Sequence, residues 1–260
     1  MTHNSGGEVL DLAKNAFATR HLTSRPLFAV NPLAPAHMAF DDLQGHSFDV
    51  APVDDGGSFY RYVERDWLAS SGVVEDFAKP IQAPLMIPDS APLHECLDKL
   101  TSRPWLFVLE KEEVSGIVAL ADLQAPSVSV FVFANILSIE ANLKSRIAAI
   151  DGWVSQLNPE RTDKLEQVHQ MRRKYNVDTD LIDALMLDDQ ARLIAKLKIF
   201  KQIGFDSRNK FEGWAEDTKR LRDMLAHGGN VLDQNPDPKL ALEQVLGLYD
   251  LATAISSDSL

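Results

Sequence analysis

The chain has 260 residues, 45% of them apolar and 25% charged, a composition typical of a globular protein with one large domain or two modest ones. Its net charge of −12 argues against broad, nonspecific binding of nucleic acid. The single cysteine, Cys96, excludes an intrachain disulfide and a thiolate metal cluster, and it favours a reducing compartment. Residues 1–7 lack a secretory pattern, and the apolar run 128–139 is too short to span a bilayer. We therefore expect a cytoplasmic protein without a membrane segment.

The first half of the chain contains an internal repeat. Residues 35–43 and 92–100 share Pro, His, Asp and Leu at a constant offset of 57, which indicates two copies of one supersecondary unit. In each copy a proline precedes a short helix, and a strand, a turn and a second strand follow. Short connections favour antiparallel pairing of the two strands. The expected helices are 37–43 and 94–100, and the expected strands are 48–53, 59–63, 105–110 and 116–120.

A strand followed by a helix start, ending on an aspartate, appears in both copies. Residues 114–123 contain Asp122, and the first copy has Asp66 at the matching position. These residues resemble a tandem pair of CBS domains, with repeats at about 20–70 and 80–126. The resemblance implies a ligand-sensing unit in which the aspartates bind the ribose of an adenine nucleotide such as AMP, ADP or ATP.

The two copies depart from that family at one position. Nucleotide-binding CBS pairs usually have Ser or Thr three residues before the aspartate, and here Val63 and Ala119 stand there. A second interpretation stays open, in which Asp66 and Asp122 only cap the helices that follow. Basic residues that would replace the missing phosphate contact are Arg65, Arg103 and Lys111.

The second half shows helical periodicity throughout. The sequence predicts five helices with short connections, which favour antiparallel neighbours in an up-and-down bundle. We therefore predict an α+β chain, with a domain of short strands and helices at 1–126 and an all-α domain at 127–260. The expected helices are 136–150, 159–175, 180–203, 207–227 and 238–255.

The fourth of these helices ends in a motif that carries potential chemistry. Arg222 and His227 stand five residues apart, Asp223 follows the arginine, and Gly228 stops the helix. The stretch 192–222, with nine basic and four acidic residues, leads into it. Such a run is also common on solvated helix faces.

This motif resembles the signature of HEPN domains, which are helical bundles. The resemblance implies a metal-independent endoribonuclease that needs no cofactor and acts as a homodimer on RNA. Attack by the 2′-hydroxyl would use His227 for proton transfer and Arg222 for the phosphate charge. Asp223 is part of the same site, and Asn230 and Glu140 are weaker candidates for positioning.

Three interpretations of the bundle remain open. In the first, a ligand bound to the repeats regulates a HEPN-type ribonuclease, with or without a protein antitoxin. In the second, the chain is a noncatalytic nucleotide-sensing adaptor whose bundle dimerises or binds a protein partner. In the third, the motif is accidental, His227 caps the helix, and Arg222 pairs with Asp223 or Asp217.

Overall fold

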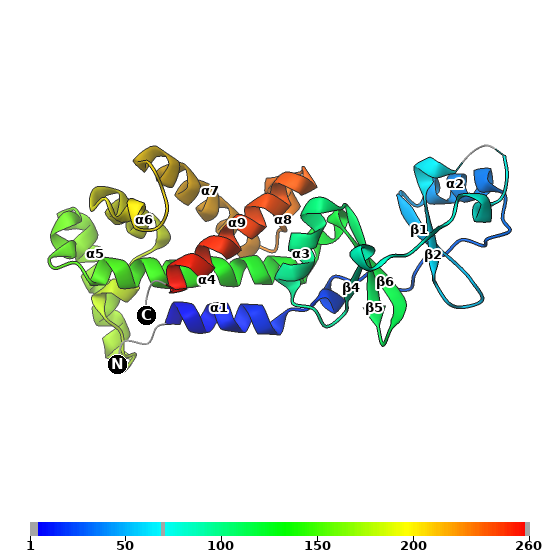
Figure 1. Ribbon diagram of the computed structural model, residues 1–260. Coiled ribbons are helices and arrows are strands. Elements are labelled where there is room, and N and C mark those ends of the chain that lie inside the picture. The colour runs from blue at the N-terminus through cyan, green and yellow to red at the C-terminus, as the bar shows by residue number, and fades with distance from the viewer. Residues whose placement is uncertain (1–4, 69–70, 258–260) are drawn as a thin grey trace. The chain divides into compact units, whose positions relative to one another are not determined.

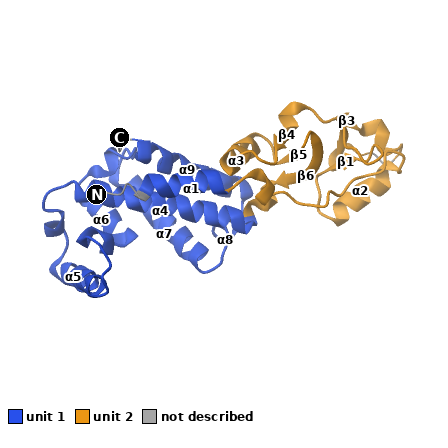
Figure 2. Ribbon diagram, turned by 90° about the horizontal axis from the view of Figure 1, so that it is seen from below, with its two compact units in different colours: residues 1–16, 124–260 blue, residues 17–123 orange. Residues whose placement is uncertain are grey.

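The computed structural model describes residues 5–68 and 71–257, which form two compact units (Figures 1 and 2). Unit 1 combines residues 1–16 with 124–260, and unit 2 spans 17–123. The limits that we expected at residues 1, 70 and 260 lie outside the described residues. The division after residue 123 lies close to the expected one at 126, but the first sixteen residues group with the helical bundle rather than with the repeats.

Helix α1 (Ser5–Ala16), which is not among the helices expected from the sequence, explains this difference. Its Leu10 and Ala13, spaced along one face, are buried in unit 1. At Gly6 the helix lies so close to α4 (Pro126–Ala148) that a Cβ atom would stand 2.4 Å from the Asn142 amide nitrogen. Ser138 of α4 also donates a hydrogen bond to the Gly6 carbonyl at 2.7 Å. The helix therefore depends on a distant segment, which local periodicity does not reveal.

Unit 2 contains two three-stranded sheets, with strand orders β1-β2-β3 and β4-β5-β6. The predicted antiparallel pairs are confirmed: β1 pairs with β2, and β5 pairs with β6. Strands β3 and β4 were not predicted, because two or three residues are too short for a recognisable alternation. The elements are β1 (Val50–Val53), β2 (Arg61–Glu64), β3 (Lys79–Pro80), β4 (Met86–Pro88), β5 (Trp105–Glu110), β6 (Glu113–Ala119), α2 (Ala36–Gly45) and α3 (Leu93–Ser102).

The two repeats of unit 2 exchange their leading segments. Thr19, which precedes the first repeat, donates its backbone N–H to Ala91 at the start of the second-repeat helix at 2.8 Å. Val74, which precedes the second repeat, donates in the same way to Ala34 of the first at 3.0 Å. The segment before the first repeat thus bonds to the second repeat, and the segment before the second repeat bonds to the first. Neither repeat is a separate unit, and the exchange explains why two copies of modest length share one fold.

Buried side chains form one cluster inside the first repeat and another where the sheets meet. Val53, Val63 and Leu43 belong to the first cluster. Tyr62 of β2 belongs to the second, and its ring centroid lies 5.4 Å from that of Trp105 on β5. Such edge-to-face contacts add to the apolar burial and fix the two sheets against each other.

Unit 1 is a helical bundle built on α4, against which α1, α6, α7 and α9 pack (Figure 1). Helix α4 begins ten residues before the expected 136–150. At this length its apolar composition is sufficient for a membrane span, but half of its most apolar 18-residue stretch is buried inside the protein. The helices are α4 (Pro126–Ala148), α5 (Pro159–Lys174), α6 (Leu187–Lys196), α7 (Arg208–Ala226), α8 (Val231–Gln234) and α9 (Pro238–Ser257).

The single helix that we predicted over 180–203 is wrong. It is replaced by a 3-10 helix (Leu181–Ala184), the helix α6 and a second 3-10 helix (Ile199–Lys201). The reason is local hydrogen bonding: the Asp183 and Asp189 carboxylates accept the backbone N–H groups three residues before them, and each starts a new turn.

Candidate functional sites

Arg222 of α7 is held by two carboxylates. Its Nη1 donates to Glu140 Oε1 of α4 at 2.9 Å, and its Nη2 donates to Asp223 Oδ1 at 3.0 Å. Only 19% of the Arg222 side chain and 13% of the Glu140 side chain are exposed. The structure therefore brings together three of the five residues proposed for the RNA site, Glu140, Arg222 and Asp223, in one ion-pair cluster inside unit 1.

The electrostatics of this cluster favour a permanently charged and compensated arginine. Burial opposes the charge on Arg222, but the hydrogen bonds to Glu140 and Asp223 outweigh burial, so the pKa of the guanidinium stands above its ordinary value. Each positive hydrogen-bonding edge that a phosphate would require is already directed at a carboxylate. In this arrangement Arg222 joins α7 to α4.

His227 and Asn230 are placed differently from Arg222. His227 is the exposed C-cap of α7, and its backbone N–H bonds to the Asp223 and Met224 carbonyls. Asn230 caps α8: its side chain accepts the Leu232 N–H at 2.9 Å. The Asp223 carboxylate bonds to Arg222. Of the two motif residues, His227 is thus solvent-accessible and Arg222 is engaged in packing.

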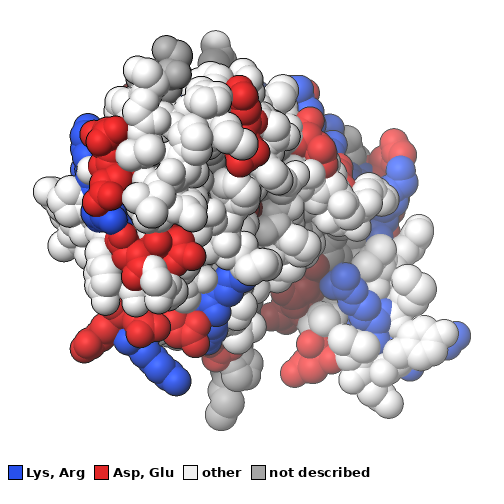
Figure 3. Space-filling view, turned by 90° about the vertical axis from the view of Figure 1, so that its right-hand side faces the viewer, with Lys and Arg blue, Asp and Glu red and all other residues white. Residues whose placement is uncertain are grey.

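The basic run at 192–222 is partly neutralised, because five of its nine basic residues form ion pairs with neighbouring acids. Figure 3 faces unit 2, where acidic side chains stand beside a few basic ones, so the charges around this run are judged from its ion pairs instead. Ion pairs on or next to α7 join Arg208 to Glu212, Lys210 to Asp206, Lys219 to Asp188 and Arg220 to Glu216. These pairs support the solvated-face interpretation of the run.

In unit 2, Asp122 has the geometry of a cap. It lies in the 3-10 helix Leu120–Gln124, accepts the Ala119 N–H at 2.7 Å, and accepts the Ser24 hydroxyl at 3.2 Å. Burial raises the pKa of its carboxyl, against the opposing effect of these two hydrogen bonds. The structure thus supports the capping interpretation for Asp122, while one of its bonds comes from the exchanged segment of the other repeat.

Asp66 is arranged differently, although it occupies the matching position. Its side chain is 87% exposed, and the nearest cation is Arg65, whose Nε lies 3.8 Å away. Arg65 itself pairs with Asp49 at 2.8 Å. An exposed carboxylate at this position is free to accept hydroxyl groups from a ligand.

Two more cations, one from each repeat, act on Glu64 of β2. Lys79 of β3 stands over the ring of Trp67, with Nζ 3.5 Å from the ring centroid. Burial raises the pKa of the Glu64 carboxyl, and the charges of Lys79 and Arg103 oppose that shift, which places both cations near Glu64. Arg103 is exposed. Sequence reasoning missed Lys79 and Trp67; the aromatic residue directly after Asp66 was the available signal.

Lys111 lies at the opposite end of β6 from Asp122. It lies in the two-residue turn between β5 and β6, whereas Asp122 follows the far end of β6. A seven-residue strand separates the two positions, which corresponds to roughly 20 Å. The expected phosphate contact by Lys111 is therefore wrong for the Asp122 side.

Solved structures of CBS-domain proteins are similar to the N-terminal part of the chain. An uncharacterized conserved protein from Pyrococcus horikoshii is 18% identical, covering 41% of this chain and 88% of its own, with a TM-score of 0.37. A CBS domain protein from Pyrobaculum aerophilum, complexed with AMP, is 19% identical, covering 41% and 90%, with a TM-score of 0.36. A CBS-pair protein from Arabidopsis thaliana is 20% identical, covering 41% and 90%, with a TM-score of 0.36. No family profile and no curated protein matches the chain.

Proposed function

We propose that this chain is a noncatalytic adaptor in which unit 2 binds an adenine nucleotide and unit 1 binds a protein partner or a second copy. The observation that carries the noncatalytic role is the paired Arg222. A ribonuclease requires an arginine that is open to the phosphate, and this one is compensated by Glu140 and Asp223 within the bundle.

The nucleotide-binding role rests on the charged and aromatic groups around Glu64 and Asp66. Arg103 and Lys79 supply positive charge for a phosphate, Trp67 supplies an aromatic surface, and the exposed Asp66 supplies an acceptor for ribose hydroxyls. We expect binding here rather than at Asp122, whose carboxylate already accepts two hydrogen bonds. Binding at this face would regulate the partner affinity of unit 1.

A metal-independent ribonuclease is the second candidate, and the exposed imidazole of His227 supports it. Its site would need Arg222 to leave Glu140, or a second copy to provide an unpaired arginine across a two-fold interface. The protein would then leave RNA ends with a 2′,3′-cyclic phosphate.

Calorimetric titration of the full chain tests nucleotide binding. The probes are AMP, together with 5′-methylthioadenosine and S-adenosyl-L-methionine, which are bound in another CBS pair. We expect Arg103→Ala and Lys79→Ala each to weaken AMP binding at least tenfold, because each removes a phosphate-facing charge. Lys174→Ala on α5 removes an equal charge from unit 1 and serves as the control. Equal affinity in all variants, or no binding by wild type, contradicts the proposal.

A cleavage assay separates the two candidates. Wild type and His227→Ala are incubated with total RNA in EDTA, with and without AMP. The adaptor role predicts no difference between them. Cleavage by wild type alone, with cyclic phosphate ends, establishes the ribonuclease instead.

A further inference from the structure

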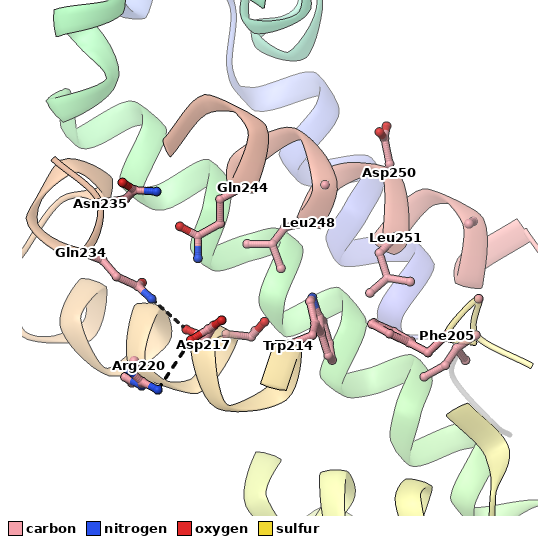
Figure 4. A pocket seen from close by; sticks show the side chains of 15 residues that line it. Phe205, Trp214, Asp217, Arg220, Gln234, Asn235, Gln244, Leu248, Asp250 and Leu251 are labelled. Atoms are coloured by element: carbon pink, nitrogen blue, oxygen red, sulfur yellow. Dashed lines mark hydrogen bonds and ion pairs between the residues drawn. The ribbon is translucent and has the colours of Figure 1, made fainter. Parts of the chain in front are cut away.

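A groove runs between α7 and α9 in unit 1. Both helices pack on α4, and the space between them is an open groove of about 990 Å³. Figure 4 shows its two ends, Gln234 of α8 at one and Phe205, which precedes α7, at the other. The groove lies outside the Arg222 cluster, since none of its lining residues belongs to that cluster.

The floor of the groove is apolar and partly aromatic. Trp214 of α7 and Phe205 have ring centroids 5.2 Å apart, and both rings are only partly buried. Leu248 and Leu251 of α9 face them across the groove (Figure 4). Leu248 is buried, whereas Phe205, Trp214 and Leu251 are partly exposed. Partly exposed aromatic and leucine side chains in a concave surface are typical of sites that receive apolar side chains.

Gly247 opens the α9 wall of this groove. It lies inside α9, where glycine costs about 1 kcal/mol relative to alanine. A Cβ atom at this position would meet no described atom within 4 Å, so packing within the chain does not require glycine. A bare backbone at a groove wall allows close approach of another molecule.

The rim of the groove is negatively charged. Asp217 stands on the α7 side and Asp250 on the α9 side. The basic residue of the lining, Arg220, lies 3.2 Å from Glu216 and 3.6 Å from Asp217, so these two acids share its charge and the local balance, with Asp250, stays negative. A second copy of this chain would bring its own net charge of −12 toward this rim. The charge pattern therefore favours a basic occupant over a second copy.

We propose that this groove binds one amphipathic helix of a protein partner, with basic residues flanking its apolar face. Leucine or aromatic side chains of that helix would contact Trp214 and Leu251, and its lysines or arginines would lie near Asp217 and Asp250. Packed helices lie about 8–10 Å apart. A helix bound in this groove would contact both α7 and α9, which themselves pack on α4. This inference rests on the adaptor role proposed above and names the class of partner.

A selection experiment tests the proposal on the full chain. The probe is a display library of 18-residue amphipathic helices with varied apolar residues and either lysine or glutamate at the flanking positions. We expect the enriched sequences to carry lysine flanks. Synthetic versions should bind at least tenfold more tightly than their glutamate-flanked counterparts in fluorescence anisotropy, and they should shift the indole N–H resonance of Trp214. Absence of enrichment, or enrichment of glutamate flanks, overturns the proposal.

Matched variants locate the binding. Gly247→Leu fills the groove and should weaken the selected peptide at least tenfold. Gly213→Leu is the control, because Gly213 is also helical, exposed and without atoms within 4 Å of a Cβ. Asp250→Lys should weaken binding, whereas Glu166→Lys on α5, with the same change in net charge, should not. Equal effects within either pair overturn the assignment.

The same measurements separate this inference from the adaptor role. If the peptide binds in the groove with an affinity that does not respond to AMP, the proposed regulation by nucleotide is refuted and the groove assignment stands. AMP binding by unit 2 without any groove peptide would remove the groove assignment while nucleotide sensing stands. Concentration-dependent self-association that Gly247→Leu abolishes would identify a second copy as the occupant and overturn the partner helix.

Discussion

Arg222→Ala is expected to destabilise unit 1 because it leaves the Glu140 carboxylate without its partner. Removing one member of a buried ion pair costs about 3–5 kcal/mol. The Arg222 and Glu140 side chains are 19% and 13% exposed, so water can partly solvate the carboxylate that is left and reduce this cost. We therefore expect a loss of about 2–3 kcal/mol in the free energy of unfolding. For a unit of roughly 150 residues, that loss lowers Tm by about 5–10 °C.

The assay is thermal unfolding by circular dichroism, with urea unfolding as a second measure. Arg220→Ala is the matched control, since Arg220 lies two residues away on the same helix, is 63% exposed and pairs only with exposed acids. Its loss should stay within about 0.5 kcal/mol. The double variant Arg222→Met with Glu140→Leu should recover most of the stability, because no buried charge remains unpaired.

Two outcomes would refute this reasoning. If Arg222→Ala is no less stable than Arg220→Ala, the pair with Glu140 does not hold α7 to α4 in solution. Arg222 would then be available for a ligand, which favours the ribonuclease. If the double variant is as unstable as Arg222→Ala, the loss comes from packing of the arginine stem rather than from an unpaired carboxylate.

Three further predictions concern unit 2. Lys111 and Glu112 form a two-residue hairpin turn with φ of 50° and 73°, a conformation that Asn-Gly adopts more readily. The double variant Lys111→Asn with Glu112→Gly should therefore raise the free energy of unfolding in urea by about 1–2 kcal/mol. An unchanged urea midpoint would show that the turn is not strained. Burial raises the pKa of Asp122 above its ordinary value, so the folded state binds the proton more readily than the unfolded state. The stability from this group is therefore present at low pH and is lost as the pH rises through the raised folded-state pKa. Asp122→Asn should therefore equal or exceed wild type in stability at pH 7 and lose any advantage near pH 3, and the opposite trend would reverse the assignment. Burial raises the pKa of Cys96 to about 11, so its thiol should resist an aromatic disulfide reagent at pH 8 until urea unfolds the chain, whereas rapid reaction of the folded protein would show an open site.

The candidate sites could be predicted only in part. Glu140 was named from sequence as a positioning residue, and the structure places it against Arg222, 82 positions along the chain. The direction of its effect was not predictable, because a carboxylate near an arginine serves equally as a catalytic partner or as a structural ion pair. Asp66 and Asp122 show the same limit, although they occupy matching positions of the two repeats. The Asp66 carboxylate is exposed, whereas the Asp122 carboxylate accepts two hydrogen bonds as a cap.

The sequence by itself determined the elements whose causes are local. The repeat at an offset of 57 predicted the helix and the antiparallel strand pair of each copy. The helix expected from residue 159 is confirmed as α5, whose start has a local cause: the Asn158 side chain accepts the Arg161 N–H. Only the tertiary structure decided the rest. It placed α1 in the bundle, completed each repeat with the leading segment of the other, and left a groove between α7 and α9. These features depend on contacts between segments far apart in the chain. Hydrophobic periodicity, helix caps and turn residues reflect only interactions between residues that are close in sequence.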